Sequence, residues 1–330
     1  MTAATATDGS GAPPRIVDAH CHAASEEILP PSFVDGMVAN LACALAGRGI
    51  DVPASALRRR FEPHLQDPLC DKLVEEMERA GIDHTVLLVP DFTVALDDCL
   101  LSIEESFERH REILARHPGR FTVFGGVDPR WGSDGVALFE RSLDAFGFGG
   151  FKVYPPCGYS PSDPELFPYY ELCAHHHVPV VVHVGPTSPV LSFEHTNPFD
   201  LDRAAHAFPT VNFILAHGCA NFVEQCVMMC RFRPNVYLDV SGYQSVGPAG
   251  GPDGPIGRTV AQGINHKVLF GTDWPVFRLQ GDQQTVVEEM LADEGPLSEI
   301  PEREREQILC GNVERLLGQR APVRAGRLAE

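Results

Sequence analysis

The stretch Ile16-Val17-Asp18-Ala19-His20-Cys21-His22 decides how the rest of the chain is interpreted. Its apolar start predicts a short, buried β-strand. Side chains alternate between the two faces of a strand, so we expect His20 and His22 on one face and Ala19 and Cys21 on the other. Two imidazoles held side by side supply half of a divalent-metal site. Because the pattern is short, two ordinary strand histidines remain the alternative.

Length, composition and charge limit the classes of protein to which the chain can belong. Its 330 residues suffice for one large barrel or sandwich, or for two ordinary domains. A formal net charge of −19 without any basic run argues against nucleic-acid binding. No apolar run reaches the roughly 18 residues of a membrane span. We therefore expect a small-molecule substrate and no nucleic-acid or membrane partner.

The cysteines and the first residues indicate the compartment and the domain boundaries. Ten cysteines occur without a CxxC pair, which favours reduced thiols in a cytoplasmic protein over a disulfide framework. Residues 1–14 are rich in Ala, Thr, Gly and Pro and predict a disordered leader that lacks the apolar core of a signal peptide. We expect residues 15–330 to form a single domain.

Apolar runs alternate with helical patterns along the rest of the chain. After the strand at Ile16-Val17, further strands are predicted at 84–89, 121–127, 150–154, 178–184, 211–217, 236–240 and 267–273. Continuous apolar strands are typical of a parallel sheet that is buried on both faces. Eight β/α units over this length predict an α/β fold, a (β/α)₈ TIM barrel. A doubly wound open sheet is the rival, but no GxGxxG follows the first strand.

The segment at about 23–68 interrupts this alternation. It is too long for a plain loop and contains an Ala-rich helical pattern near 34–46. We predict an insertion with its own helices after strand 1, and we expect it to cover the site as a cap.

Titratable residues fall at the predicted carboxyl ends of the strands, where barrels carry their chemistry. Each has an ordinary alternative: His183 could be a core histidine, and Asp273 could cap the turn before Trp274. Together, histidines and one acid from strands one, five, six and eight would converge on one point, as a catalytic zinc site requires. The strand-end residues are His20, His22, Asp91, Asp128, Lys152, His183, His217 and Asp273.

This ordered set resembles the amidohydrolase superfamily of metal-dependent barrels. More narrowly, it resembles the amidohydrolase-2 branch, which includes the aminocarboxymuconate-semialdehyde decarboxylase-like enzymes. The resemblance spans about residues 15–318 without the insertion, and its motifs lie at 149–156, 179–183, 216–218, 269–275 and 308–317.

The resemblance implies roles for individual residues. His20, His22, His183 and Asp273 would hold a metal, most often zinc in such a site, with Mn²⁺ as an alternative. His217 would lie beside the metal and either polarise the substrate or bind a second ion. Asp273 would also shuttle a proton. Members of this family are often dimers, so a homodimer is expected.

Lys152 is singled out because only three of the chain's 26 Lys and Arg residues are lysines. As a catalytic or metal-binding residue it could be carboxylated and bridge two metals, as in some members of the superfamily. It could instead contact a phosphate or carboxylate directly. A plain salt bridge to Asp128 or Asp273 is the third alternative.

Aromatic and histidine side chains in the predicted loops of the catalytic face are candidates for substrate binding. They would suit a ring or another flat substrate, although each could simply pack the loops. The candidates are Tyr154, Tyr159, His195, Tyr243 and Trp274.

Three functions fit these observations. The first is a metal-dependent hydrolase that uses a metal-activated water on an amide, imide, lactam, lactone or ester of a small, cyclic or aromatic substrate. The second is a non-oxidative decarboxylase of an aromatic or unsaturated acid, with Asp273 or His217 as proton donor. A non-catalytic scaffold is the third, and the intact ligand set argues against it. Lys152 favours hydrolysis, because the decarboxylases of this branch usually lack that lysine.

Overall fold

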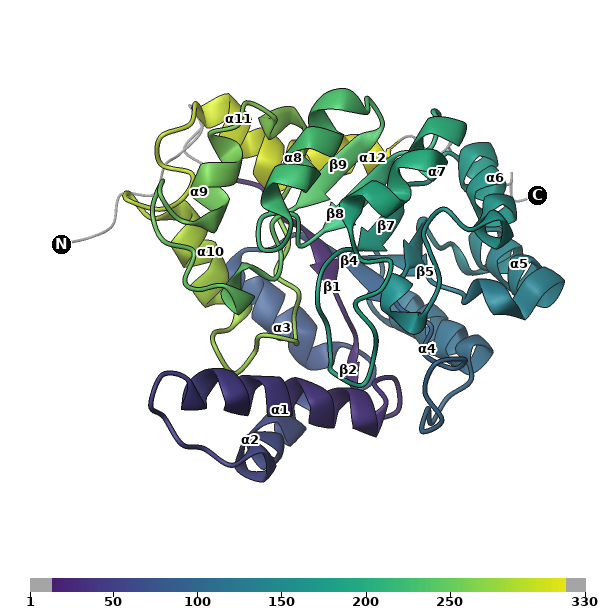
Figure 1. Ribbon diagram of the computed structural model, residues 1–330, viewed down its shortest axis with the longest axis horizontal. Helices are drawn as coiled ribbons and strands as arrows, with labels where there is room; N and C mark the ends of the chain where they lie inside the picture. Colours follow the sequence, from purple (N-terminus) through teal and green to yellow (C-terminus); the bar gives the residue numbers. More distant parts are fainter. Residues whose placement is uncertain (1–13, 319–330) are drawn as a thin grey trace, which may run out of the picture.

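A ring of parallel strands forms the centre of the protein in the computed structural model, which describes residues 14–318 (Figure 1). The leader predicted at residues 1–14 lies outside the described residues, apart from Pro14. Within the described part of the chain the ring has eight strands: β1 (Val17–Cys21), β4 (His84–Val89), β5 (Phe121–Gly125), β6 (Gly150–Val153), β7 (Val180–His183), β8 (Phe213–Ala216), β9 (Val236–Asp239) and β10 (Val268–Leu269).

The strands follow one another around the ring in chain order, and every pair is parallel. β10 is shorter than the strand predicted at 267–273, because only Val268 and Leu269 pair with β9. The next residues turn to β1 instead. The amide of Ala19 donates to the carbonyl of Phe270 at 2.9 Å, and the amide of Asp273 donates to the carbonyl of His20 at 2.8 Å. These bonds bring the two edges together, and the predicted TIM barrel is confirmed.

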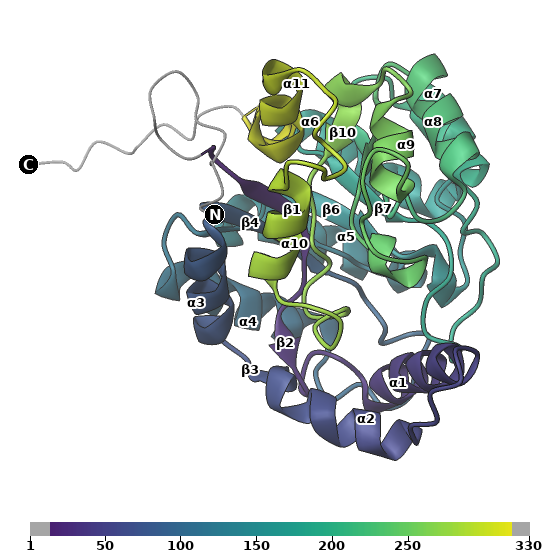
Figure 2. The ribbon, with the colours of Figure 1, turned by 90° about the vertical axis from the view of Figure 1, so that its left-hand side faces the viewer.

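Helices surround the ring on its outer face (Figures 1 and 2). They alternate with the strands in the order expected from the sequence, and additional helices follow β10. The described helices outside the insertion are α3 (Asp71–Ala80), α4 (Ile103–Arg116), α5 (Gly132–Arg141), α6 (Phe167–His176), α7 (Asp202–Ala207), α8 (Val223–Phe232), α9 (Pro255–Val260), α10 (Gln283–Leu291), α11 (Glu302–Glu306) and α12 (Asn312–Leu317). None of the described helices is both long and apolar enough to cross a bilayer.

Helix ends follow local sequence signals. α3 ends at Gly81, whose φ of 71° is left-handed and therefore suits glycine. α4 begins at Ser102, which accepts a bond from the Glu105 amide while the Glu105 carboxylate accepts one from the Ser102 amide. This reciprocal cap satisfies two backbone donors that would otherwise lack a partner.

The interior of the ring is filled by side chains, as expected of a barrel of this size. Phe124, Val181, Ile214 and Leu269 belong to one buried cluster. Val313 and Leu316 of α12 join the same cluster, so α12 closes one end of the barrel. Chemistry is therefore confined to the other end, where the strands end at their carboxyl termini.

The segment inserted after β1 contains two helices and a short two-stranded sheet. Its elements are β2 (Ala24–Ser25), α1 (Pro31–Ala46), α2 (Ala54–Phe61) and β3 (Gln66–Asp67). Both ribbon views place α1 and α2 beyond the carboxyl end of β1 (Figures 1 and 2). The predicted helix near 34–46 begins at Pro31, a residue that suits a first helical turn. The role of this segment as a cap stays a prediction.

Helix α1 is joined to the loop that follows β7. Ser188 Oγ donates to the Phe33 carbonyl at 2.9 Å, and Asn40 Nδ2 donates to the Thr187 carbonyl at 3.2 Å. Gly36 allows this approach, because a Cβ at that position would lie 2.0 Å from Ser188 Oγ. The insertion is therefore packed against the barrel mouth.

Candidate metal centre and substrate pocket

His20 and His22 bring two imidazoles together at the end of β1. Their rings pack edge to face with centroids 5.3 Å apart. His20 Nδ1 is 2.8 Å from Asp239 Oδ2, and His22 Nδ1 is 2.8 Å from the Leu88 carbonyl. Because both Nδ1 atoms are engaged, both Nε2 atoms are left for the site. Asp273 Oδ1 lies 3.5 Å from His20 Nε2 and 3.3 Å from His22 Nε2.

The simple alternation predicted for β1 is not kept. Pairing between β1 and β4 shifts register between Asp18 and Cys21. Ala19 packs inside the barrel, whereas Cys21 belongs to the outer cluster, so these two side chains do not share a face as predicted. The irregularity lets the strand place Ala19 within the interior and still direct His20 towards the site.

His217 directly follows β8, Asp273 lies in the segment after β10, and both have left-handed backbone conformations. Their φ angles are 62° and 55°, which cost non-glycine residues on the order of 1–3 kcal/mol. The His217 amide donates to Asp239 Oδ1 at 3.0 Å, which helps to hold the turn. His217 Nδ1 lies 2.9 Å from Ser241 Oγ and 3.9 Å from Asp273 Oδ2. Such strained turns, over-determined by their surroundings, cluster at functional sites.

His183 ends β7 and completes the group. Its ring centroid lies 4.9 Å from that of His217 and 4.6 Å from that of Tyr154. The side chain is buried, yet Nε2 has no hydrogen-bond partner among the described residues. A buried imidazole nitrogen without a partner costs free energy, so this atom points to a ligand.

Burial sets the protonation state of these groups. It lowers the pKa of His20 to about 4 and that of His183 well below its usual value. Burial raises the pKa of Asp273, but the attraction of His217 and a hydrogen bond from His22 outweigh it and lower the pKa overall. Neutral imidazoles and an ionised carboxylate are the forms that bind metal ions.

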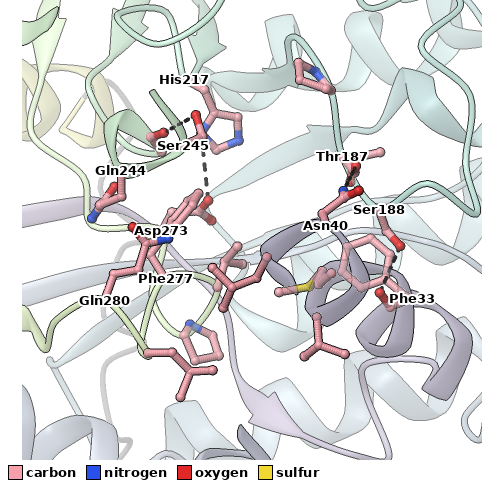
Figure 3. A pocket seen from close by; sticks show the side chains of 18 of the residues that line it. Phe33, Asn40, Thr187, Ser188, His217, Gln244, Ser245, Asp273, Phe277 and Gln280 are labelled. Atoms are coloured by element: carbon pink, nitrogen blue, oxygen red, sulfur yellow. Dashed lines mark hydrogen bonds and ion pairs between the residues drawn. The ribbon is translucent and has the colours of Figure 1, made fainter. Parts of the chain in front are cut away.

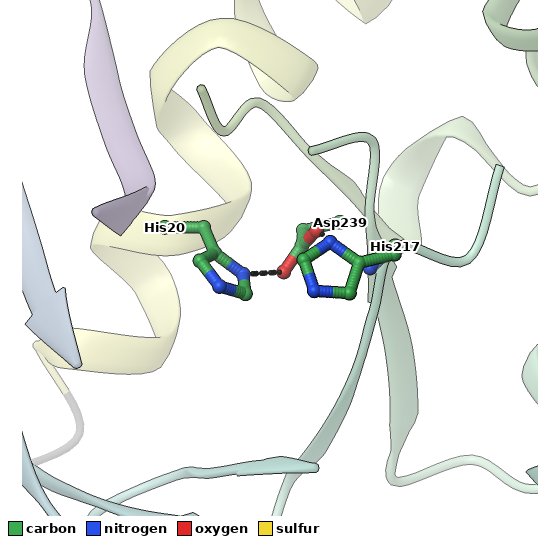
Figure 4. Close-up of side chains that lie close together, drawn as sticks. All are labelled: His20, His217 and Asp239. Atoms are coloured by element: carbon green, nitrogen blue, oxygen red, sulfur yellow. Dashed lines mark hydrogen bonds and ion pairs between the residues drawn. The ribbon is translucent and has the colours of Figure 1, made fainter. Parts of the chain in front are cut away.

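A divalent metal fits this donor set. Two groups have potential ligand atoms within 4.8 Å of one another in the described part of the chain: His20, His22 and Asp273, and His20, His217 and Asp239. His183 belongs to neither group. The Nε2 atoms of His20 and His183 are buried without partners within residues 14–318, as expected of donors that await an ion. Figure 4 shows His20, His217 and Asp239 converging from three strand ends.

Asp239 was not among the residues that the sequence singled out. It ends β9 and is fully buried. Besides His20 and the His217 amide, it binds Ser241. Burial raises its pKa, but His20 and His217 outweigh burial and lower it overall. Its position at the end of a predicted barrel strand could have marked Asp239 as a candidate, but the sequence could not reveal which residues it would bind.

We expect Asp239→Asn to weaken metal binding by about 10–100-fold, the usual cost of losing the carboxylate that orients a ligating histidine. The amide cannot accept from His20 as a charged oxygen does, so the ring loses its fixed orientation. Titration with Zn²⁺ or Mn²⁺ measures the change. Unaltered affinity would contradict an orienting role for Asp239.

Lys152 lies on β6 with its side chain 1% exposed. Its Nζ has no hydrogen-bond partner and makes no salt bridge to Asp128 or Asp273 within the described residues, so the plain salt-bridge alternative is not met. Burial lowers its pKa to about 8, although Asp239 and Asp273 oppose the shift. A buried, unpaired amine beside the histidines remains consistent with carboxylation or with binding an anion.

We expect Lys152→Met to stabilise the metal-free protein near neutral pH. Each pKa unit corresponds to about 1.4 kcal/mol, so charged Lys152 costs on the order of 3 kcal/mol at a folded-state pKa of about 8 against 10.5 unfolded. The cost is complete below about pH 8 and disappears as the pH rises to about 10.5. Urea unfolding of both proteins across this range tests the prediction. Equal stability near pH 7 would contradict it.

The other carboxylates noted at strand ends have structural partners. Asp91 Oδ2 accepts from the Asp128 amide at 2.9 Å and from Trp131 Nε1 at 3.1 Å. Asp128 forms a salt bridge with Arg130. Asp18 accepts from the amides of His20 and Thr272, each at 3.0 Å. These carboxylates fix the loops and the strand that carry the candidate ligands.

A pocket of about 390 Å³ opens above the candidate ligands. His22, His183, His217 and Asp273 line its inner end, and Tyr154 lines it beside Thr187. Figure 3 shows Phe33 and Asn40 of α1 on the side opposite Phe277 and Gln280. The sequence analysis did not single out these α1 side chains as pocket residues.

Of the five residues predicted to bind substrate, Tyr154 lines the pocket. The others are directed elsewhere. The Tyr159 hydroxyl accepts from the Tyr154 amide at 2.8 Å, and Tyr243 donates to Glu289 at 2.8 Å. Trp274 Nε1 donates to Glu76 at 3.1 Å, and His195 lies 3.7 Å from its neighbour Glu194. The structure gives these four side chains packing or loop contacts rather than places in the pocket lining.

The ring of parallel strands, with histidines and carboxylates at its carboxyl ends, defines the class of (β/α)₈ barrel enzymes with a candidate metal site. The chain belongs to the amidohydrolase family: the family model described as Amidohydrolase, of the amidohydrolase-2 branch, matches residues 17–319. The resemblance seen in the sequence is thereby confirmed. No curated protein matches the chain.

Several solved structures share the fold. An uncharacterised TIM-barrel protein from Bordetella bronchiseptica is 22% identical, with a TM-score of 0.61, and the match covers 92% of this chain and 99% of that one. 5-Carboxyvanillate decarboxylase from Sphingomonas paucimobilis is 15% identical over 92% and 99%, with a TM-score of 0.63. A dihydroxybenzoic acid decarboxylase from Polaromonas, with bound manganese and the inhibitor 2-nitroresorcinol, is 19% identical over 93% and 98%, with a TM-score of 0.61.

Proposed function

We propose that this protein is a metal-dependent, non-oxidative decarboxylase of an aromatic or unsaturated carboxylic acid. The observation that carries the proposal is the placement of His22, His183 and Asp273 at the inner end of a largely apolar pocket, with the buried His20 grouped beside His22 and Asp273. The two decarboxylases with the same fold support it, since both act on aromatic acids by name. We propose these four residues as the ligands of one divalent ion, zinc or manganese, with His217 beside them.

The chain's own residues have distinct tasks in this reaction. A bound divalent ion would supply positive charge for the substrate carboxylate and a neighbouring hydroxyl. Lys152 would add a cationic amine at the same end. Phe92 and Phe277 line the pocket and would exclude water, which strengthens these charge interactions.

Asp273 is the proposed proton carrier. Its pKa is lowered in spite of burial, so it enters the reaction as a carboxylate and can take the proton of a substrate hydroxyl. It then gives this proton to the ring carbon that bears the carboxylate. The C–C bond breaks, its electron pair restores the ring, and CO₂ leaves. His217, 3.9 Å from Asp273, is placed to stabilise the Asp273 carboxylate before the first transfer and after the second.

Hydrolysis of a small amide, lactone or ester is the second candidate, and Lys152 is the observation that favours it. A carboxylated Lys152 would suit a site with two ions, and its unpartnered amine leaves that modification open. Mass spectrometry under CO₂-containing buffer would detect the added mass.

Isotope-labelled assays test the two candidates against each other. Metal-loaded protein would be incubated in H₂¹⁸O with 2,6-dihydroxybenzoate, 5-carboxyvanillate and a panel of lactones and esters. Release of CO₂ without ¹⁸O in the aromatic product supports decarboxylation. Incorporation of ¹⁸O into a product, with no CO₂ from any acid, would sink the decarboxylase proposal in favour of hydrolysis.

A further inference from the structure

The pocket extends well past the candidate ligands. His22, His183, His217 and Asp273 account for its inner end only, and its volume of about 390 Å³ lies in the roughly 300–1,000 Å³ range of pockets for drug-sized ligands. The rest of its wall comes largely from the insertion and from the loop after β10. What this outer part binds is a separate question from the chemistry at the ligands.

Helix α1 presents an apolar stripe to the pocket. Phe33, Met37, Leu41 and Leu45 recur every four residues, so they lie on one face of the helix, and all four line the pocket. Phe33 is buried, but Met37, Leu41 and Leu45 are only partly buried. These three side chains therefore keep apolar surface that a ligand would cover.

The wall that faces this stripe is also apolar. Phe92, Val276, Phe277 and Leu279 line the pocket, and the last three follow Asp273 in the chain. Asn40, Arg48 and Gln280 are exposed at the rim, whereas Ser188 is buried and Thr187, Asn221 and Gln244 are partly buried in other parts of the lining. The part of the pocket between the α1 stripe and this wall is thus apolar, with the candidate ligands at the inner end and exposed polar side chains at the rim.

We propose that the substrate carries an apolar substituent on the side opposite its carboxylate, and that this substituent lies along the α1 stripe. The inference rests on the proposed function for its polar end. The substrate class is therefore an aromatic acid with an alkyl or aryl group para to the carboxylate, larger than a simple hydroxybenzoate. Each buried methylene contributes to binding in proportion to the apolar area it loses to solvent.

Binding of non-reactive analogues tests the inference without turnover. The probes are 2-nitroresorcinol and its 5-methyl, 5-propyl and 5-pentyl derivatives, which have no carboxylate to lose and carry the chain para to the nitro group. Calorimetry with manganese-loaded protein should show affinity rising by up to about fourfold per added methylene. A flat series, or no binding by any member, overturns the inference.

Matched variants of α1 locate the effect. Leu41→Gln places a polar group in the stripe and should remove most of the gain from 5-propyl and 5-pentyl, measured relative to the affinity of the same variant for 2-nitroresorcinol. Ala39→Gln makes a similar polar change on the exposed side of the same helix, outside the pocket lining, and should leave the whole series unchanged. Equal effects of the two variants would overturn the assignment to the stripe.

The two proposals fail in different ways. Chain-length-dependent binding without CO₂ release from any dihydroxybenzoate would sink the decarboxylase proposal and leave the apolar subsite standing. CO₂ release from 2,6-dihydroxybenzoate with no preference for longer chains would support the decarboxylase proposal and overturn the apolar subsite.

Discussion

His183→Ala is expected to remove the divalent metal from the protein. The ring of His183 is buried against Tyr154 and His217, and its Nε2 has no protein partner in the described residues, so the side chain offers a free donor to an ion. Loss of a direct ligand should cost more than the 10–100-fold that loss of an orienting neighbour costs. Metal content of the protein purified without chelators, measured by plasma mass spectrometry, checks this.

His110→Gln is the matched control for that experiment. His110 is fully buried on α4 and has an unpartnered Nε2 within residues 14–318, but it does not line the pocket. His110 is close enough to His22 to sense its charge, but it is neither a candidate ligand nor part of the pocket lining, so metal content should stay near the wild-type level. If His183→Ala keeps its full metal content, or if both variants lose metal equally, His183 is not a ligand.

Asp273→Asn is expected to lower the rate of CO₂ release by about 10²–10⁴-fold, the usual contribution of a positioned proton-transfer group. The amide keeps the shape of the side chain but cannot accept and return a proton. Because Asp273 is also a proposed ligand, metal content must be measured on the same sample and restored by excess Mn²⁺ before rates are compared. Deuterium delivery to the ring carbon in D₂O reports on the transfer itself.

Asp128→Asn provides the comparison for Asp273→Asn. Asp128 is also buried and lies just past the end of β5, but it pairs with Arg130 and lies outside the pocket lining. We expect lower thermal stability with little change in the rate per folded molecule. A rate for Asp273→Asn within a few-fold of wild type, once metal is restored, would remove Asp273 from the proton path.

Periodicity predicted the barrel because each strand is a local signal. The residues from Val86 to Val89 and from Val180 to Val182 are all apolar, and burial on both faces demands that pattern. β10 differs, because the residues after Leu269 bond to β1 at the far end of the sequence. No local pattern reports which partner a strand end will choose.

The candidate site was predictable in part for the same reason. His20, His183, His217 and Asp273 stand at strand ends, so their convergence followed from the fold alone. The positions of the Tyr243 and Trp274 side chains could not be predicted in this way. Their hydrogen bonds go to Glu289 and Glu76, which lie 46 and 198 residues away in the chain.

The pocket wall contributed by the insertion was also missed, although a signal was present. The spacing by four residues from Phe33 to Leu45 was visible in the sequence. It does not show whether this face of the helix packs against the barrel core or lines a cavity. The orientation depends on the contacts of α1 with the loop after β7, and those contacts are long-range.

The same contacts link the proposed apolar subsite on α1 to the candidate metal centre. Asn40 holds the Thr187 carbonyl, the Thr187 hydroxyl is 2.6 Å from that of Tyr154, and the Tyr154 ring packs 4.6 Å from that of His183. Helix α1 and a candidate ligand are therefore joined by a continuous chain of three contacts. A substrate that displaces α1 would also displace the imidazole of His183. Such a substrate would then be disfavoured at the chemical step as well as at binding.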